Sequence, residues 1–504
     1  MGVGRGRRWA VAVVVVGVLV LAPFARRLVR PTLFGDDVVR IAQIRNESLG
    51  EVLRRPFNEH LAPGHGLLTW VAWELCGRRL VAAPWTFAVS AWLSYGVMLG
   101  VLGWAVWRRG GGRAVALGVV AWAGLSWLTI EVMAYHSGSG FVWALAATVG
   151  AWALAGPSWR ARVGAMVCAA VAPTFSAIGV LAGPAGAVGG WWADESVGSE
   201  RVAGRRRAGA ALAPLAGTLM YLAVAVAAHH GLTVARGLER RVDLGVGLLA
   251  AGRAVARVLP WAAVGGRPAW SAPLGWADAV GGAVVVGVVL AVAWRTRQWA
   301  WAFAGLVLTG GGYGLTYPFR YEGSSEWLLR VDRYHLFPQV GFALWVAMLG
   351  RWAVRRWPGL GGAWSGPLVA AVLVVLQGRQ IDQRLRFYEF AEQGRVLAAL
   401  EELEAVCRVE GITRTQALAA LEPIRTSWLH PERHGTTVLA MLGPTVPKSR
   451  VPDGAVRERL LETLSGPARE ALWGGDGRDA VRAARGGSRG GGSGWVGGGG
   501  SGAD

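Results

Sequence analysis

The sequence predicts an all-α membrane protein: a polytopic transmembrane helical bundle of about eleven spans, with outer interfacial helices and a small helical C-terminal appendage. Two observations predict this class. The 504-residue chain is 53% apolar with a mean hydropathy of +0.36, whereas soluble domains are about 45 to 50% apolar even with glycine counted. Its apolar residues also fall into blocks of roughly 17 to 25, the length of a helix that crosses a ~30 Å hydrocarbon core.

The first block, "WAVAVVVVGVLVLAPFA" over residues 9–25, follows the basic segment "GRGRR". Such an arrangement could be a secretory signal, but the apolar stretch is longer than a usual signal core, and no clear A-x-A cleavage site follows it. We therefore expect a short N-terminal segment, residues 1–8, followed by a retained first span.

Further blocks follow along the chain. Two of them are short and are separated by "APTFS", so they could form one helix broken at Pro173, because proline removes a backbone donor and favours a kink. The expected spans lie near residues 84–107, 114–130, 139–156, 161–174, 177–193, 208–228, 276–294, 299–317, 334–350 and 365–377. Together with the first they define a transmembrane region over residues 9–380.

Arginine placement predicts the orientation, because short cytoplasmic loops carry an excess of Lys and Arg. The short outer turns near residues 131–137 and 174–177 contain neither residue type. If the N-terminus is cytoplasmic, arginine-rich inner segments lie around residues 5–8, 108–113, 160–162, 201–207, 295–297 and 351–356. The formal net charge of +20 is then explained by arginines facing anionic lipid headgroups, and nucleic-acid binding is not indicated.

The character of the chain changes near its C-terminal end. Residues 381–475 contain the charged amphipathic stretch "RLRFYEFAEQGRVLAALEELEAVCRVEG" and a second helical stretch, "TRTQALAALEPI". We expect a small helical region here, on the outer side of the membrane. Residues 476–504 are rich in glycine and cannot bury a core, so they are expected to form a disordered tail.

The first outer loop, residues 26–80, contains the polar side chains that could take part in a reaction or bind a ligand. It holds the adjacent carboxylates Asp36 and Asp37 and, within "RRPFNEHLAPGHGLLTWVAWELCG", the side chains of Glu59, His60 and His65. Long outer loops that are partly apolar tend to lie along the membrane surface as interfacial helices. Such a loop predicts a shallow cavity at the bilayer boundary, suited to a substrate with a lipid tail and a polar head.

Three short motifs resemble a known family. An acidic pair after the first span, followed by "FNEHLAPGH", resembles the first outer loop of the GT-C superfamily of membrane glycosyltransferases, which includes the protein O-mannosyltransferase-like enzymes. "SWLTIEVMAYHSG" places Glu131 and His136 in the next outer turn, where that family often has an acidic motif. "VDRYHLFPQVGFALW" resembles the family's Arg-Tyr-x-x-x-Pro motif before a late span, matched by Arg333, Tyr334 and Pro338.

The resemblance implies a GT-C-like fold and an inverting transfer of a sugar from a polyprenyl-phosphate donor to an unknown glycan, lipid or protein acceptor at the outer membrane face. We expect no cofactor. Asp37 or Asp36 is expected to be the general base, with Asp37 preferred, because an attacking hydroxyl needs a base within hydrogen-bond reach. Arg333 is expected to bind the phosphate through its forked, permanently charged guanidinium. The other expected substrate-binding residues are Glu59, His60, His65, Glu131, His136 and Tyr334.

Other interpretations of these residues remain open. Asp36 and Asp37 could cap the helix that starts "DDVVRIAQI", since carboxylates there satisfy free backbone donors and favour the helix dipole. "EHLAPGH" could bind a divalent metal together with the aspartates, although regular ligand spacing is absent and we expect no metal. Glu131 could be a solvated interfacial carboxylate, and Arg333 and Tyr334 could be simple interface anchors.

A transporter or lipid flippase is the rival class, and a non-catalytic GT-C-like protein is a third possibility because fold does not fix function. Transporters keep ionisable residues near the membrane midplane and often contain repeats with broken helices. In this sequence the predicted spans are almost free of acidic residues, and the carboxylates gather in one outer loop. The composition, rich in Gly, Ala, Val, Arg and Trp, is typical of a GC-rich genome. The expected location is therefore the cytoplasmic membrane within the cell envelope of a bacterium.

Overall fold

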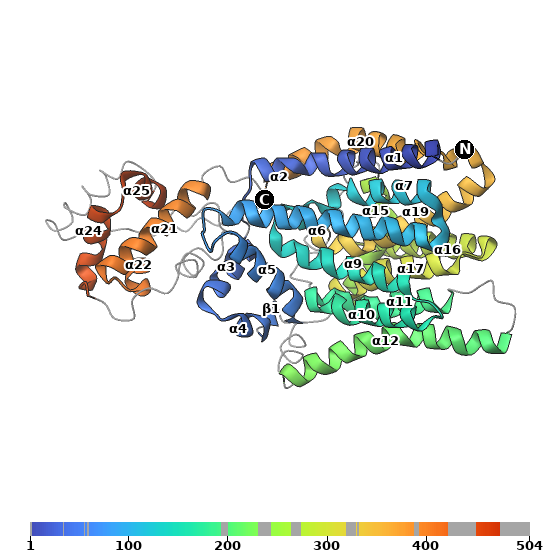
Figure 1. The fold of residues 1–504 in the computed structure, drawn as a ribbon, viewed down its shortest axis with the longest axis horizontal. Coiled ribbons are helices and arrows are strands. Elements are labelled where there is room, and N and C mark those ends of the chain that lie inside the picture. The colour runs from blue at the N-terminus through green and yellow to red at the C-terminus, as the bar shows by residue number, and fades with distance from the viewer. Residues whose placement is uncertain are drawn as a thin grey trace. The chain divides into compact units, whose positions relative to one another are not determined.

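The computed structural model describes most of the chain and divides it into two compact units, Met1–Glu389 and Phe390–Asp504 (Figure 1). The described residues are 3–33, 35–54, 56–57, 60–192, 200–229, 243–263, 274–318, 329, 332–387, 393–421 and 450–473. The expected glycine-rich tail, residues 476–504, lies outside them.

The first unit is built from α-helices joined by short helical turns, which confirms the predicted all-α class. Strand structure in the described residues is one antiparallel pair, β1 (Pro56–Phe57) with β2 (His60–Leu61). The α-helices are α1 (Val3–Leu21), α2 (Arg26–Val29), α3 (Gly35–Asn46), α4 (Leu49–Arg54), α5 (Pro63–Leu75), α6 (Ala83–Val106), α7 (Gly112–Gly124), α8 (Ile130–Ala134), α9 (Ser139–Leu154), α10 (Trp159–Phe175), α11 (Ala182–Trp191), α12 (Glu200–His229), α14 (Leu244–Arg253), α15 (Leu259–Ala263), α16 (Trp276–Thr296), α17 (Trp299–Thr316), α19 (Leu336–Arg356) and α20 (Ser365–Phe387). The short turns are η1 (Ala22–Ala25), η2 (Trp107–Gly111), η3 (Trp127–Thr129), η4 (His136–Gly138), η5 (Ala177–Leu181), η6 (Ala254–Val258), η7 (Asp332–His335) and η8 (Pro358–Gly361).

Six helical segments of the described chain are long and apolar enough to cross a membrane. They are Gly6–Val29, Ala83–Gly124, His136–Leu154, Gly204–Ala228, Leu244–Ala262 and Trp276–Thr296. Membrane character is therefore supported, while the expected number of about eleven spans is not confirmed by this count. The segment Ala83–Gly124 contains two helices, α6 and α7, because the backbone leaves helical geometry at Arg109 and at Gly110, whose φ is +78°.

The candidate span Leu244–Ala262 is absent from the spans expected from the sequence. Arg253 and Arg257 interrupt its apolar run, so inspection of the sequence for long apolar blocks does not identify it as a span. In the structure Arg253 forms a buried ion pair with Asp278 at the start of α16, with Nη2 and Oδ2 2.7 Å apart. Pairing removes most of the cost of placing the arginine between helices, because an isolated buried charge is far more expensive than a paired one.

Residues 161–193, which could have formed one broken helix, form two separate ones. Pro173 lies inside α10, which continues to Phe175. The chain turns at the next residue, Ser176, whose backbone is extended. The following turn η5 packs against α10: a methyl group at Gly179 would collide with the backbone of Ala172. The chain therefore folds back at this point.

Close helix packing in the bundle depends on glycine at a few positions. α17 packs along α19, and a methyl group added at Gly305 would collide with Trp345 and with the backbone of Gly341. A methyl group at Gly341 would in turn meet the Gly305 carbonyl. Small residues let helix backbones approach one another where the surrounding lipid supplies no hydrophobic driving force for association.

Two arginines of the segment 108–113 contact neighbouring helices at one end of the bundle. The guanidinium of Arg113 lies 5.8 Å from the ring centre of Trp9, so the start of α7 meets the start of α1. Arg109 donates hydrogen bonds to the carbonyl oxygens of Gly189 (3.1 Å) and Ala155 (2.8 Å). Helices α3 and α5 lie beyond the opposite end of α1, away from the N-terminus (Figure 1).

The second unit contains four described helices: α21 (Gln393–Glu410), α22 (Arg414–Leu421), α24 (Asp453–Thr463) and α25 (Gly466–Trp473). Leu400, Leu403 and Leu460 are fully buried in it. The boundary between units falls after Glu389, because α20 continues to Phe387 and keeps the first residues of the expected C-terminal region, 381–387, in the first unit.

Candidate functional site

A cavity of about 320 Å³ lies where segments distant in the sequence meet. Its walls come from the start of α3, the start of α5, the turns around η4 and η5, the end of α17, and η7. The polar side chains in its lining are Asp36, His65, Tyr135, Ser137, Ser176, Thr316, Arg333 and Tyr334. Three regions that carry separate sequence motifs therefore contribute to one cavity: residues 26–80, the turn around residues 131–137 and the Arg333–Tyr334 motif.

The two adjacent aspartates have different surroundings. Both lie in the first turn of α3, and Asp36 lines the cavity. Asp37 is 1% exposed and accepts hydrogen bonds from the backbone N–H groups of Ser137 (2.7 Å) and His136 (3.2 Å) and from the Ser137 hydroxyl. Consecutive residues on a helix point about 100° apart, so the pair divides between the cavity and the protein interior.

The different surroundings of the two aspartates argue against Asp37, the preferred candidate from the sequence, as the general base. Its carboxylate accepts hydrogen bonds from three donors of His136 and Ser137 and does not line the cavity. Asp36 is the carboxylate of the pair that a ligand in the cavity could reach. Both carboxylates also lie where the helix dipole favours negative charge, which agrees with the alternative interpretation of the pair as a helix-start signal.

Glu131 and Arg333 form a second polar group at the cavity. An Nη1 atom of Arg333 lies 2.6 Å from Glu131 Oε1, and the backbone N–H of Arg333 donates to Glu131 Oε2 at 3.0 Å. The Tyr135 hydroxyl donates to Glu131 Oε1 at 2.7 Å and accepts from Arg333 at 2.8 Å. Glu131 is therefore a buried, ion-paired carboxylate rather than a solvated interfacial one, and Arg333 is held by a specific partner.

The Arg333 guanidinium stays charged in this position. Burial disfavours its charge, but the oxygens of Tyr135 and Tyr334 and the carboxylates of Glu131 and Asp36 hold its pKa above the ordinary value. Within the described residues its hydrogen bonds use only the backbone N–H and Nη1. Nε and Nη2 are the side-chain nitrogens without a hydrogen bond there, and Arg333 is part of the cavity lining.

His335 holds the turn η7 in place. Its Nδ1 lies 2.9 Å from the Tyr313 hydroxyl on α17, and its Nε2 lies 2.8 Å from the carbonyl oxygen of Leu329. Complete burial lowers the pKa of His335 to about 4, so the ring is neutral near pH 7. Neutral His335 thereby fixes the backbone that carries Arg333 and Tyr334.

The expected histidine positions separate in the structure. His65 is buried and lines the cavity, while His136 packs behind it, with ring centres 5.8 Å apart. The His136 Nε2 lies 3.2 Å from the Thr69 hydroxyl, and its ring packs on Phe87. Glu59 lies outside the described residues, and for His60 only the backbone, in β2, is described.

Several site residues were missed by the sequence analysis. Tyr135 and Ser137 flank His136 in "AYHSG", so the run of polar residues in that turn was the available signal. Arg27 follows the first apolar block; its guanidinium donates to the Thr32 hydroxyl (2.6 Å) and carbonyl (2.9 Å) and to the Ala134 carbonyl. Arg27 therefore joins α2 to the end of α8, next to the cavity residue Tyr135.

Among the described residues, no group of three or more His, Cys, Asp or Glu side chains is placed to hold a metal ion. Comparisons with protein-family models, with curated proteins and with solved structures find no match for this chain.

Proposed function

We propose that this protein is an integral membrane glycosyltransferase, resembling the GT-C superfamily, that transfers a sugar from a polyprenyl-phosphate donor to an acceptor at the outer membrane face. The observation that carries the proposal is the cavity itself. Its lining contains both a carboxylate, Asp36, and a partly free guanidinium, Arg333, supplied by segments almost 300 residues apart. A sugar phosphate needs both groups: a base for the nucleophile and a cation for the departing phosphate.

In the proposed reaction Asp36 acts as the general base. It takes the proton from an acceptor hydroxyl while the acceptor oxygen attacks the anomeric carbon of the donor sugar. The bond between that carbon and the phosphate oxygen breaks, and polyprenyl phosphate leaves with the bonding electrons. A single displacement of this kind inverts the configuration at the anomeric carbon.

Arg333 binds the leaving phosphate through Nε and Nη2 in this proposal. Its Nη1 is held by Glu131 and Tyr135, so Glu131 acts as a positioning residue that sets the direction of the guanidinium fork. A bidentate guanidinium contact with phosphate is strong and directional. His65 and Tyr334, also in the lining, are assigned to contacts with the sugar.

The proposed orientation places the N-terminus in the cytoplasm and the cavity on the outer face of a bacterial cytoplasmic membrane. Gly50, exposed in α4 with no neighbouring atom within 4 Å of an added methyl group, is a suitable labelling position. A Gly50→Cys variant in intact cells is expected to react with a membrane-impermeant maleimide. Labelling only after the membrane is disrupted would contradict the orientation and the outer-face site.

The activity is tested with purified protein, acceptor-containing membranes and a panel of radiolabelled polyprenyl-phosphate sugars, by measuring the release of polyprenyl phosphate. For the sugar that reacts, Asp36→Asn is expected to lower turnover by about 10² to 10⁴-fold, because Asn keeps the size of the side chain but removes the base. The matched control is Asp243→Asn: Asp243 caps α14 through Val246 N–H (2.9 Å), and Asn is an equally good cap. Wild-type turnover in Asp36→Asn would exclude Asp36 as the base.

One observation favours a second candidate, a transporter or lipid flippase. The ion pair Arg253–Asp278 joins two candidate membrane spans, with Arg257 3.5 Å from the same carboxylate. Ionisable groups inside spans often mark a translocation path. Fluorescent polyprenyl-phosphate lipid in vesicles reconstituted with the protein separates the two functions: exchange between leaflets without sugar transfer, abolished by Asp278→Asn, would favour the flippase.

A further inference from the structure

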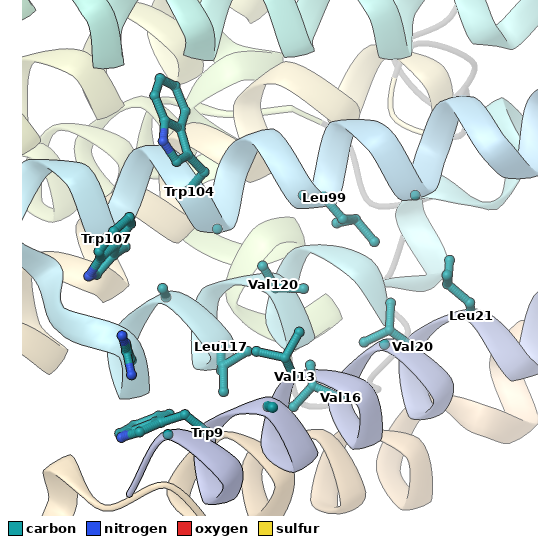
Figure 2. Close-up of a pocket in the computed structure, with 18 residues that line it drawn as sticks. Trp9, Val13, Val16, Val20, Leu21, Leu99, Trp104, Trp107, Leu117 and Val120 are labelled. Atoms are coloured by element: carbon teal, nitrogen blue, oxygen red, sulfur yellow. The ribbon is translucent and has the colours of Figure 1, made fainter. Parts of the chain in front are cut away.

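A second and larger hollow lies on a different part of the first unit. It is a groove of about 590 Å³ between α1, α6 and α7, and we call it the α1 groove (Figure 2). Aliphatic side chains of Val13, Val16, Leu99, Leu117 and Val120 form its length. α1 is long enough, at 19 residues and about 1.5 Å per residue, to run across most of a hydrocarbon core.

The two ends of the α1 groove differ in chemistry. Trp9, Trp104 and Trp107 lie toward one end, and Leu21 and Leu99 lie toward the other (Figure 2). The one charged residue of its lining, Arg113, lies at the tryptophan end, with its guanidinium over the Trp9 ring. Tryptophan and arginine together are typical of the boundary between lipid tails and headgroups.

Positive charge at this end is available to a ligand. In the part of the chain that the structure describes, Arg113 forms the ring contact with Trp9 and neither an ion pair nor a hydrogen bond. Arg7 and Arg8, which precede Trp9 on α1, are also exposed. The groove therefore offers a cationic mouth and an apolar channel, complementary to an anionic headgroup with an attached chain.

Glycines keep the channel open. Methyl groups added at Gly17 on α1 or Gly100 on α6 would meet no atom within 4 Å, and one at Gly96 would meet only Leu21, at 3.8 Å. All three glycines belong to the lining. Their open space shows that the groove is wider than the side chains of α1 and α6 require for packing against each other.

We propose that the α1 groove binds one acyl chain of an anionic phospholipid from the leaflet at the N-terminal end, with the lipid headgroup held by Arg113. Charge complementarity favours this occupant over a second protein helix, because a helix would leave the cationic mouth without a partner. The groove volume also falls in the range of small-molecule pockets, about 300 to 1,000 Å³. The inference is independent of the proposed transferase activity, because Asp36 and Arg333 belong to the other cavity.

The test is native mass spectrometry of the detergent-purified protein titrated with phosphatidylglycerol or with phosphatidylcholine of the same acyl chains. We expect the wild-type protein to retain one phosphatidylglycerol more tightly than any phosphatidylcholine. Gly100→Leu fills the groove and is expected to abolish that tight binding. Arg113→Gln removes the cation and is expected to weaken it by about fivefold, the effect of about one basic residue near an anionic headgroup.

Two matched controls separate groove binding from general effects on the protein. Gly287→Leu adds the same side chain at an exposed position of α16 with open space around it, and Arg160→Gln removes an exposed arginine that likewise lies over a tryptophan, Trp159, at 5.7 Å. Both are expected to bind phosphatidylglycerol like the wild type. Gly17→Leu fills the groove from the opposite wall and is expected to reproduce Gly100→Leu.

Three results would overturn the proposal: equal retention of the two lipids by the wild type, unchanged retention in both groove-filling variants, or equal losses in the control variants. A dimer that dissociates on Gly100→Leu, with no change in bound lipid, would instead assign the groove to a second copy of the chain. Melting temperatures of all variants, measured in the same detergent, distinguish a filled groove from a misfolded protein.

Discussion

The polar cavity and the α1 groove are both hollows in an apolar helical bundle, but they differ in which segments line them and in how their charged groups are held. The cavity is lined by segments that are far apart in the sequence, and the buried carboxylates beside it have partners that hold them in place: Glu131 pairs with Arg333, and Asp37 accepts hydrogen bonds from Ser137. The α1 groove is lined by three helices from the first 124 residues of the chain, and glycines keep it open. Its single lining charge has no ion-pair partner in the described chain.

This difference predicts how the two regions respond to substitution. Replacing a carboxylate at the cavity by an amide removes the partner of a buried charge, which lowers the free energy of unfolding by several kcal/mol. Adding a whole aliphatic side chain to the groove fills space that is already open, which costs little.

Glu131→Gln is expected to have the largest effect on stability. It leaves the partly buried Arg333 without its carboxylate partner, and breaking a buried pair costs about 3 to 5 kcal/mol. Thermal unfolding in detergent measures the loss. Glu74→Gln, which breaks the exposed pair between Glu74 on α5 and Arg78 in the turn after this helix, is the control and should leave the melting temperature unchanged. Equal losses in the two variants would remove the contrast between buried and exposed pairs.

Acid is expected to destabilise the cavity through His335. Its folded pKa, about 4, lies below the ordinary value of 6.5, so the unfolded chain binds more protons between those values. Stability contributed by neutral His335 is therefore present above pH 6.5 and is lost as the pH falls toward 4, by up to about 3 kcal/mol. Unfolding measured from pH 7 to pH 4 in the wild type and in His335→Gln tests this. An identical pH dependence in both proteins would assign the acid sensitivity to other groups.

Asp37→Asn is expected to cost about 2 kcal/mol, because an amide in place of the carboxylate loses charge-assisted bonds from Ser137 and turns a donor toward existing donors. Asp36→Asn is the matched variant one residue earlier and is expected to change stability little, since Asp36 faces the cavity. Chemical unfolding of both variants measures the difference. A greater loss in Asp36→Asn would reverse the roles assigned to the two carboxylates.

Gly100→Leu is expected to have the smallest effect, within about 0.5 kcal/mol, because its new side chain enters open space and meets no backbone. Leucine also has a better helix propensity than glycine, which offsets part of any packing cost. Gly341→Leu gives the comparison: there the added side chain would collide with Thr309 and with the Gly305 carbonyl. Similar melting temperatures for the two variants would show that the groove is closed by packing rather than open.

Hydropathy identifies the class of fold but counts spans poorly. Long apolar blocks predicted helices at the positions of α1, α6, α7, α9 and α16, because burial in lipid and helix formation both follow from composition. Short or interrupted blocks are ambiguous. α10 and α11 are too short to count alone as spans, and α14 was missed because the partner that neutralises Arg253 is 25 residues away.

The candidate site was partly readable. Motif positions indicated Asp36, His65 and Arg333, which do line one cavity. The sequence could not decide between Asp36 and Asp37, because the choice depends on the rotation of α3, which is set by hydrogen bonds to Ser137 and His136, about 100 residues away. Long-range pairings of this kind leave no local signal in composition or spacing. The catalytic roles themselves remain predictions.

The ion pair between Glu131 and Arg333 also has a consequence for biosynthesis. The ribosome makes Glu131 about 200 residues before Arg333, so a growing chain carries an acidic side chain whose cationic partner does not yet exist. The bonds from Ser137 to Asp37 join earlier segments and can form first. The parts of the cavity can therefore form in a fixed order: the hydrogen bonds to Asp37 can form early, whereas the wall that carries Arg333 can close only after residue 333 has left the ribosome. Nascent chains stalled before and after that point should differ in their susceptibility to membrane quality-control proteases.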